Sequence, residues 1–542
     1  MKFSGSCVYQ IYPKSFKDSN GDGLGDIRGI IEKLDYIKSL GVDYIWSTPF
    51  FVSPMKDNGY DIANYCEIDP RFGTMADFDE LIKLANAKGL KIMLDMVLCH
   101  TSDQHEWFQR ALAGEEQYQR YYILRDGRGN GEPPTNWQCA FGGSAWQWEP
   151  RLGKWYLHLH DVSQPDLDWT NPKVREELAN VVRFWKERGV AGFRFDVINL
   201  ISKPEIFEDD TKGLGRKLFA DGPHVHEYLR ELVKNAGIDG MITVGEMAST
   251  NLENCLLYTR PDAHELSMVF SFHHLKVDYK GGDKWALMDA DISALKKLFE
   301  EWQVCMAKAG GWNAVFWCNH DQPRAVSRFG DGSAISAKML AAAVHLMRGT
   351  PYIYQGEELG MTNAKFTSIE QYRDVESLNY YKILRESGKT ESEALKIIGE
   401  RSRDNSRTPM QWSAEKFAGF SSVEPWISSP ENFKQINVAA EENDADSVLN
   451  FYKMLVKFRK ENPIVQEGDI NFIERGNDNV VAYRRSFEGK ELIVLCNFRA
   501  ANVDLQDKTL REYTASGYKK IIGNYENLAD NLRPYEVIVF EK

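Results

Sequence analysis

GFRFD, at Gly192–Asp196, has the pattern of a short buried strand that ends in a carboxylate. Two further runs share this arrangement: ITVGE at Ile242–Glu246, and VFWCNHD at residues 315–321, which ends at Asp321. A single acid after a strand is usually a cap or turn residue. Three such acids can instead converge, because strand ends in a parallel barrel meet on one face. The pattern therefore indicates a site built from strand ends.

Apolar strand-like runs alternate with amphipathic helical runs along most of the chain. The runs that favour strands are 7–11, 42–47, 91–98, 192–198, 242–245, 267–272, 314–317 and 351–354. Helices are predicted at 27–40, 77–88, 174–188 and 336–348, among others. Strands that alternate with helices are typical of an α/β fold with a parallel sheet, and this number of strands predicts a (β/α)₈ TIM barrel.

Two segments are too long to be simple barrel loops. Residues 101–171 are rich in Gly, Trp, Tyr and Pro and predict an inserted domain, domain B, after the third strand. A second insertion, at about 366–436, follows the eighth strand. The barrel itself would comprise 1–100 and 172–465. Short alternating runs then predict an all-β, β-sandwich-like C-terminal domain at 466–542.

Composition limits the class of protein and of partner. A chain of 542 residues is expected to form two or three domains. The net charge of −13 argues against binding to nucleic acid or to an anionic membrane surface. We expect no signal segment, no membrane span and no obligatory protein partner. Eight scattered cysteines without C-x-x-C spacing favour reduced thiols and a cytoplasmic location.

The loop before the first predicted helix has the pattern of a cation site. Its oxygen-bearing residues are two apart, with glycines between them: Asp18, Asn20, Asp22, the carbonyl of Leu24, and Asp26. Hard cations favour such oxygen ligands, so we expect a structural Ca²⁺ or Mg²⁺. No organic cofactor is implied. The alternative is a polar turn that caps the helix starting at Ile27.

The three strand-end acids fit glycosidic bond cleavage with retention of configuration. A retaining enzyme holds a nucleophilic carboxylate and an acid/base carboxyl group roughly 5–5.5 Å apart. Asp196 and Glu246 end successive predicted strands, which lie side by side in a barrel. Arg194 keeps Asp196 ionised, so Asp196 is the expected nucleophile. Neighbouring Asp charges favour the protonated form of Glu246, the expected acid/base, and Asp321 would stabilise the transition state.

These motifs resemble the signature regions of the α-amylase family of glycoside hydrolases. The matching runs are 94–100 (LDMVLCH), 192–196, 244–246 and 319–321 (NHD). Further runs resemble the oligo-1,6-glucosidase subgroup: 57–61 (DNGYD), 164–169 (QPDLDW), 349–358 and 402–409. The resemblance covers essentially the whole chain and implies a barrel, a domain B and a β-rich C-terminal domain.

The resemblance also implies roles for residues around the sugar. Tyr60 would stack on the glucose that is cleaved, and Asp61 and Arg407 would hold its far hydroxyls. Four residues would contact the ring near the cleaved bond: His100, Gln164, Arg194 and His320. Cys99 departs from the family pattern, because relatives carry Asn before the signature His. A loop contact is therefore expected to be missing or rebuilt.

One segment narrows the expected substrate. Residues 271–285 (SFHHLKVDYKGGDKW) resemble the trehalose-6-phosphate hydrolases of this family. The segment follows the sixth strand on the active-site face, where two His and three Lys could meet a phosphate. Lys276 and Lys284 are the expected phosphate ligands, and the expected partner is a small phosphorylated disaccharide. The alternatives are a solvated Lys-rich loop and an oligo-1,6-glucosidase or other α-glucosidase on unphosphorylated sugars.

Overall fold

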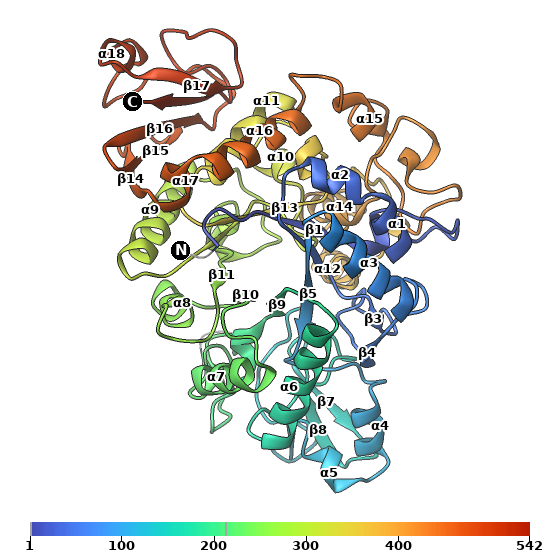
Figure 1. Ribbon diagram of the computed structural model, residues 1–542. Coiled ribbons are helices and arrows are strands. Elements are labelled where there is room, and N and C mark those ends of the chain that lie inside the picture. The colour runs from blue at the N-terminus through green and yellow to red at the C-terminus, as the bar shows by residue number, and fades with distance from the viewer. Residues whose placement is uncertain (1–2, 212–213) are drawn as a thin grey trace.

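The computed structural model describes residues 3–211 and 214–542, and its centre is a barrel of parallel strands (Figure 1). The eight-stranded sheet has the order β11-β10-β9-β5-β2-β1-β13-β12. Its strands are β1 (Val8–Ile11), β2 (Tyr44–Ser47), β5 (Lys91–Val97), β9 (Gly192–Asp196), β10 (Ile242–Glu246), β11 (Met268–Phe270), β12 (Ala314–Val315) and β13 (Thr350–Tyr354). A parallel bridge between Val269 and Asn313 joins the two ends of the sheet. The predicted (β/α)₈ barrel is confirmed.

Amphipathic helices surround the barrel as the sequence pattern predicted. The predicted helices at 77–88, 174–188 and 336–348 correspond to α3 (Met75–Ala87), α6 (Pro172–Glu187) and α11 (Ala334–His345). The predicted helix at 27–40 is instead two helices, α1 (Ile27–Glu32) and α2 (Leu34–Ser39), which meet at Lys33. Thr74 caps α3 in a reciprocal capping box with Asp77.

The segment between β5 and α6 forms a small subdomain of its own. It contains α4 (Glu106–Leu112), α5 (Glu116–Gln119) and a three-stranded sheet in the order β6-β8-β7. The three strands are β6 (Leu124–Arg125), β7 (Trp146–Glu149) and β8 (Lys154–Leu157). This is the segment predicted as domain B, and it lies at the opposite end of the molecule from the C-terminal sheet (Figure 1).

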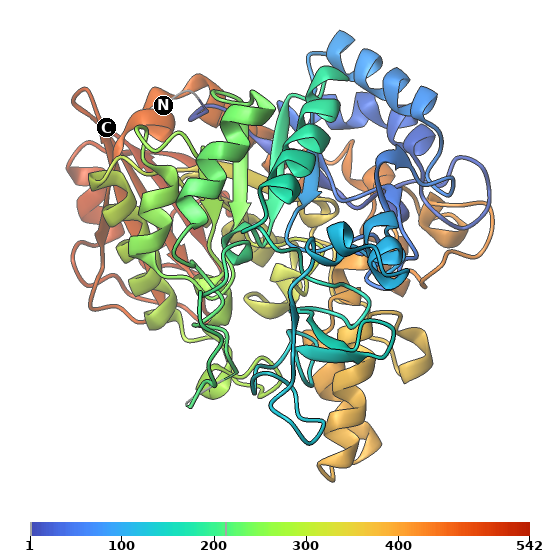
Figure 2. The ribbon, with the colours of Figure 1, turned by 90° about the horizontal axis from the view of Figure 1, so that it is seen from below.

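A helical insertion follows β13 and packs beside this subdomain (Figure 2). It includes α12 (Val375–Glu386), α13 (Glu391–Arg401) and the short α14 (Asp404–Arg407). Asn379 on α12 donates a 3.5 Å hydrogen bond to the carbonyl of Phe141 in domain B. The two inserted segments therefore meet over the carboxyl ends of the barrel strands. The chain returns to the barrel as α16 (Val448–Glu461).

The C-terminal region, predicted to be β-sandwich-like, holds a single five-stranded antiparallel sheet among its residues 466–542. Its order is β14-β15-β16-β18-β17, from β14 (Asp469–Ile473), β15 (Val480–Phe487), β16 (Lys490–Asn497), β17 (Lys519–Gly523) and β18 (Val537–Glu541). One face packs on α11, where the Tyr483 hydroxyl donates to the carbonyl of Ala343 at 3.0 Å. Leu510 and Tyr513 of the short helix α18 (Leu510–Ala515) cover the other face. Helices therefore supply the layers that a second sheet would supply in a sandwich.

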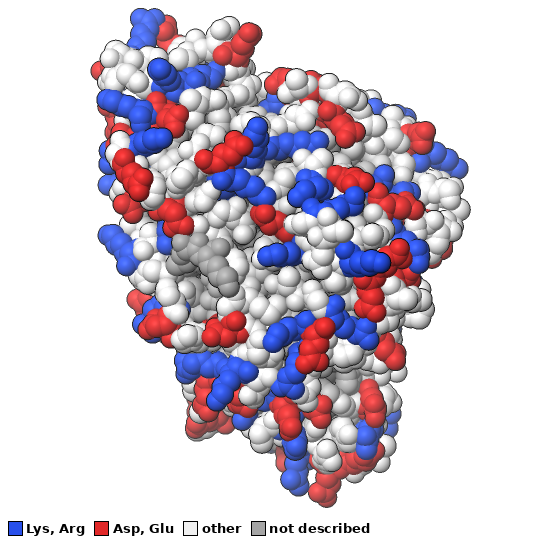
Figure 3. All heavy atoms as spheres, in the orientation of Figure 1, with Lys and Arg blue, Asp and Glu red and all other residues white. Residues whose placement is uncertain are grey.

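The surface charges are mixed in sign (Figure 3), and the cysteines are not joined in disulfides. Acidic and basic side chains are interspersed over the face shown in Figure 3. All eight cysteines are free thiols, and six of them are buried. Within the described part of the chain, none of the helices is long and apolar enough to cross a bilayer.

Candidate active site

The carboxyl ends of the barrel strands open into a cavity of about 600 Å³. All three predicted catalytic acids line it: Asp196, Glu246 and Asp321. Domain B supplies Phe141 and His160 to the wall, and the insertion after β13 supplies Glu376, Tyr380 and Arg403. The cavity is therefore enclosed by the barrel and by both inserted segments.

One buried guanidinium organises the acids at the base of the cavity. Arg194 is 1% exposed, and its Nη1 lies 2.6 Å from both Asp95 Oδ1 and Asp196 Oδ1. Its Nη2 contacts Glu246 Oε2. The Asp196 and Glu246 carboxylates thus lie at the two ends of one planar group, on adjacent strands. This arrangement is consistent with the short separation that double displacement requires.

The residue after Asp196 has a strained backbone. Val197 adopts the left-handed conformation with φ +34° and ψ +41°. A β-branched residue is disfavoured there, and such outliers cluster at functional sites. The turn at Val197 lets β9 end abruptly at Asp196, with both side chains facing the cavity.

Asp321 lies beside two guanidinium groups and one imidazole. The guanidinium of Arg407 lies 2.7 Å from its Oδ1, Arg403 lies 3.3 Å away, and His320 Nε2 lies 3.2 Å from Oδ2. Although burial opposes ionisation, His320, Arg403 and Arg407 together hold the pKa of Asp321 well below its usual range. Asp321 is therefore a carboxylate throughout the neutral range. A fixed negative charge is what an oxocarbenium-like transition state needs nearby.

Tyr60 forms one wall of the cavity. Its ring stacks on that of His320, with centroids 5.1 Å apart, and its hydroxyl donates to Asp95 at 2.9 Å. His100 also lines the cavity, and its Nε2 lies 3.1 Å from both the Tyr60 carbonyl and Gln164 Nε2. Gln164 itself is fully buried. Of these predicted sugar-binding residues, Tyr60 and His100 face the cavity, while Gln164, Arg194 and His320 lie behind and hold them.

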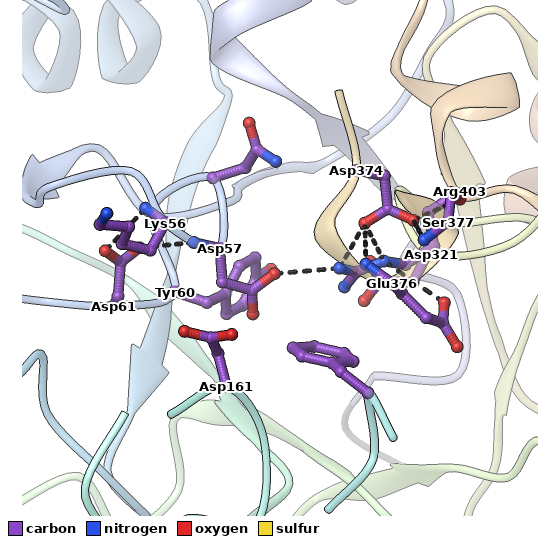
Figure 4. A network of polar contacts seen from close by, with 12 residues as sticks. Lys56, Asp57, Tyr60, Asp61, Asp161, Asp321, Asp374, Glu376, Ser377 and Arg403 are labelled. Carbon is purple, nitrogen blue, oxygen red and sulfur yellow. Dashed lines mark hydrogen bonds and ion pairs between the residues drawn. The ribbon is translucent and has the colours of Figure 1, made fainter. Parts of the chain in front are cut away.

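The structure does not support Asp61 as a ligand of the sugar hydroxyls. Its carboxylate is fully buried and accepts hydrogen bonds from Ser53 Oγ and from the backbone N–H groups of Lys56 and Asp57. Figure 4 shows Asp61 turned toward Lys56, whereas Asp57 points toward Arg403. Asp57, four residues earlier in the same motif, lines the cavity. We therefore replace Asp61 by Asp57 as the candidate ligand.

The matching correction applies to Arg407, which is fully buried and binds Asp321 from behind. Arg403 lines the cavity, and its Nη2 donates to Asp57 at 3.0 Å and to Asp374 at 2.6 Å. Burial raises the pKa of Asp57 to about 7, although Arg403 and Arg407 both act to lower it. The Asp57–Arg403 pair takes the place of the predicted pair of Asp61 and Arg407.

The loop after β11 brings both predicted phosphate ligands to the cavity. Lys276 and Lys284 line it. Lys284 is paired with Glu376 at 2.6 Å. Lys276 forms no hydrogen bond or ion pair with any residue in 3–211 or 214–542. It is accessible to solvent, yet the surrounding protein and the nearby Arg216 lower the pKa of its amine.

The two histidines of this loop, expected to meet the phosphate together with the lysines, turn away from the cavity. His274 is enclosed and its Nε2 donates to the carbonyl of Phe316 at 2.9 Å. Burial lowers the pKa of His274 to about 4, so it is neutral at pH 7. Neither His273 nor His274 lines the cavity. Their role is to pack the loop onto the barrel.

Three residues of the site were missed by the sequence reasoning. Asp57 and Arg403 lie in motifs that the sequence analysis identified, but the prediction fell on Asp61 and Arg407 of the same motifs. Arg216 also lines the cavity, and like Lys276 it has no ion-pair partner among the residues that the structure describes. No motif marks Arg216; its only signal is a basic residue in the loop that follows the nucleophile strand.

The predicted cation loop is a network of turns. Asp18 accepts from the backbone N–H groups of Asn20, Gly21 and Gly23, and the Ser421 hydroxyl donates to it. The remaining oxygens follow the same pattern: Asn20 accepts from the N–H of Asp22, Asp22 from that of Leu24, and Asp26 caps α1. Across the described ranges, no three His, Cys, Asp or Glu side chains form a metal-binding group. The cation stays a prediction.

The loop contact put in question by Cys99 is present. The Cys99 thiol lies 3.3 Å from Asp166 Oδ1, and Lys203 Nζ lies 2.8 Å from the same oxygen. Asp166 also accepts the N–H of Leu159 in domain B. The contact between the third barrel strand and domain B is therefore rebuilt around a buried lysine.

Comparisons with known proteins agree with this geometry. The family model "Alpha amylase, catalytic domain" matches residues 10–468. The trehalose-6-phosphate hydrolase of Escherichia coli (strain K12) is 50% identical, over 98% of this chain and 97% of that protein. The oligo-1,6-glucosidase of Bacillus cereus is 45% identical, over 99% and 98%. The crystal structure of Bacillus licheniformis trehalose-6-phosphate hydrolase (TreA) superposes with a TM-score of 0.93, at 51% identity over 99% of both chains.

Proposed function

The chain belongs to the alpha-amylase family, and we propose that it is a retaining glycoside hydrolase that cleaves α,α-trehalose 6-phosphate into glucose and glucose 6-phosphate. The observation that carries the proposal is that one cavity is lined both by the three predicted catalytic acids and by Lys276, a cation without an acidic partner among the described residues. Relatives named trehalose-6-phosphate hydrolase, similar over nearly the full chain, support the choice of substrate.

The chemistry follows from the placement of the acids. Asp196 attacks the anomeric carbon of the unphosphorylated glucose while Glu246 protonates the bridging oxygen, so glucose 6-phosphate leaves. Glu246 then takes a proton from water, and that water releases glucose from Asp196 with its α configuration restored. Asp321 stabilises the positive charge that develops on the ring in both steps. Arg194 contacts both reacting acids and fixes their orientation.

The two halves of the substrate need different surroundings. The glucose that is attacked would lie between Tyr60 and the Asp57–Arg403 pair, where aromatic stacking and polar contacts select an unmodified sugar. The leaving half would lie toward the loop after β11, where Lys276 offers a charged donor to a phosphate dianion. The accessible Arg216, which lowers the pKa of the Lys276 amine, is a candidate second donor.

A substrate panel tests the proposal directly. We expect trehalose 6-phosphate to be hydrolysed orders of magnitude faster than trehalose or isomaltose at equal concentration. Proton NMR early in the reaction should show that glucose is released as the α-anomer, and Asp196→Ala should abolish turnover. Comparable rates on isomaltose would instead favour the oligo-1,6-glucosidases, to which the chain is also similar. Release of glucose as the β-anomer would exclude the double-displacement assignment.

The cation site is a separate proposal. We propose that the loop from Asp18 to Asp26 binds Ca²⁺ or Mg²⁺ through side-chain oxygens and the carbonyl of Leu24. The support is a run of closely spaced oxygens in which the turns already orient Asp18 and Asp22. The hydrogen-bond network is complete without an ion, so the cation would add rigidity and would not take part in the reaction.

A further inference from the structure

A buried cluster of charges holds the loop that carries Lys276. Asp278 lies two residues after Lys276 and is only 3% exposed. Its carboxylate accepts two 2.7 Å hydrogen bonds from Arg328, and it also contacts Arg401 Nη1. The side chains of Arg328 and Arg401 are each 4% exposed. One acid therefore pairs with two buried cations that come from different segments.

The two arginines bind backbone carbonyls of the loop as well as the carboxylate of Asp278. Arg401 Nη2 donates to the carbonyl of Asp278 at 2.7 Å, and Arg328 Nη2 donates to the carbonyl of Leu275. Lys276 lies between these two anchored positions. Both guanidiniums also pack on the ring of Tyr279, at 5.3 Å and 5.2 Å from its centroid. The backbone on both sides of Lys276 is thus fixed.

The cluster also reaches the catalytic side of the cavity. Arg328 belongs to α10 (Ala325–Arg328), and its Nη1 donates at 3.0 Å to Gln322, the residue after Asp321. Arg401 ends α13 in the segment that carries Arg403. Arg328 and Arg401 therefore connect three loops: the one with Lys276, the one with Asp321 and the one with Arg403. Although burial opposes ionisation, Arg328 and Arg401 hold the pKa of Asp278 below its usual range.

We propose that Asp278 is a positioning residue that sets the distance between the phosphate-binding and bond-cleaving parts of the cavity, and so determines selectivity for phosphorylated disaccharides. This inference rests on the proposed function. Lys276 can reach a phosphate only if its backbone stays fixed relative to Asp196 and Asp321. A flexible loop would let Lys276 remain in water, where it would contribute little to substrate binding.

The test compares two substrates in Asp278→Asn, which removes the charge and keeps the shape. We expect KM for trehalose 6-phosphate to rise about tenfold, as for loss of one charged hydrogen bond, with a much smaller change in kcat. With p-nitrophenyl α-glucoside, which has no phosphate, kcat/KM should change far less. Inhibition by inorganic phosphate should weaken in parallel. Asp278→Glu, which keeps the charge, should restore part of the selectivity.

A matched control separates positioning from general stability. Glu265 is also a buried acid between two basic groups, His226 at 2.8 Å and Arg230 at 2.9 Å, but it does not line the cavity. Glu265→Gln should lower Tm without changing the ratio of the two substrates. Equal losses on both substrates in Asp278→Asn, and in Arg401→Gln if the first variant does not fold, would overturn the inference. A wild-type enzyme without preference for the phosphorylated sugar would instead overturn the proposed function.

Discussion

Removing the amine of Lys276 tests the choice of substrate most sharply. In Lys276→Met the side chain keeps its length and its apolar stem, and only the charge and the donors are lost. A charged hydrogen bond contributes about 1.5–3 kcal/mol, which corresponds to about a 10- to 150-fold change in kcat/KM. Because Lys276 remains accessible to solvent, we expect the lower end of this range. The loss should appear with trehalose 6-phosphate and not with p-nitrophenyl α-glucoside.

The loop supplies its own control for this experiment. Lys280 is an exposed lysine of the same loop that does not line the cavity, so Lys280→Met makes the same change in net charge. Lys284 lines the cavity, but it is already paired with Glu376, so we expect a smaller loss of selectivity from Lys284→Met. Steady-state kinetics on both substrates give the comparison. The reasoning is refuted if Lys276→Met and Lys280→Met behave alike, or if the unphosphorylated substrate suffers equally.

Three further predictions concern the sugar-binding pair, His274 and the cation loop. Asp57→Asn should lower kcat/KM by about 10- to 150-fold on both substrates, since a charged hydrogen bond to the sugar contributes about 1.5–3 kcal/mol, whereas Asp61→Asn should mainly lower Tm. The folded protein keeps His274 neutral down to about pH 4, so the unfolded chain binds more protons between pH 4 and 6.5, and stability should rise with pH in this window. In His274→Gln this rise, measured as the free energy of unfolding by urea titration at each pH, should shrink by roughly 3 kcal/mol. Millimolar Ca²⁺ should raise Tm and EDTA should lower it, and Asp18→Ala should abolish both effects; a Tm indifferent to Ca²⁺ and Mg²⁺ would exclude the cation.

The sequence predicted the barrel well because each strand is a short apolar run with no competing pattern. All eight predicted strands overlap observed ones, and the acids at the ends of β9 and β10 fall where the register places them side by side. The helix predicted at 27–40 breaks at Lys33, a bend that periodicity cannot show because both halves keep their apolar faces. Strand ends could therefore be predicted, whereas bends in helices could not.

The errors in the site have a common physical origin. Asp57 and Asp61 lie in one five-residue motif, and a motif does not say which acid faces a cavity. The backbone turns over within that motif, so Asp61 accepts N–H groups while Asp57 is free to meet Arg403. The pairing of Asp57 with Arg403 depends on contact between segments far apart in the chain. The sequence alone does not show that these two segments lie close together in the folded protein.

The ion pair between Asp57 and Arg403 also has a consequence for how the protein is made. One partner is synthesised early, as the second barrel strand ends, and the other emerges only after the entire barrel sheet has left the ribosome. Until the segment with Arg403 and Arg407 has emerged, Asp57 and Asp321 lack the guanidinium groups that pair with them, so the nascent chain cannot complete its pocket. We therefore expect a chain that ends before residue 403 to be inactive, because its pocket lacks the basic partners of Asp57 and Asp321.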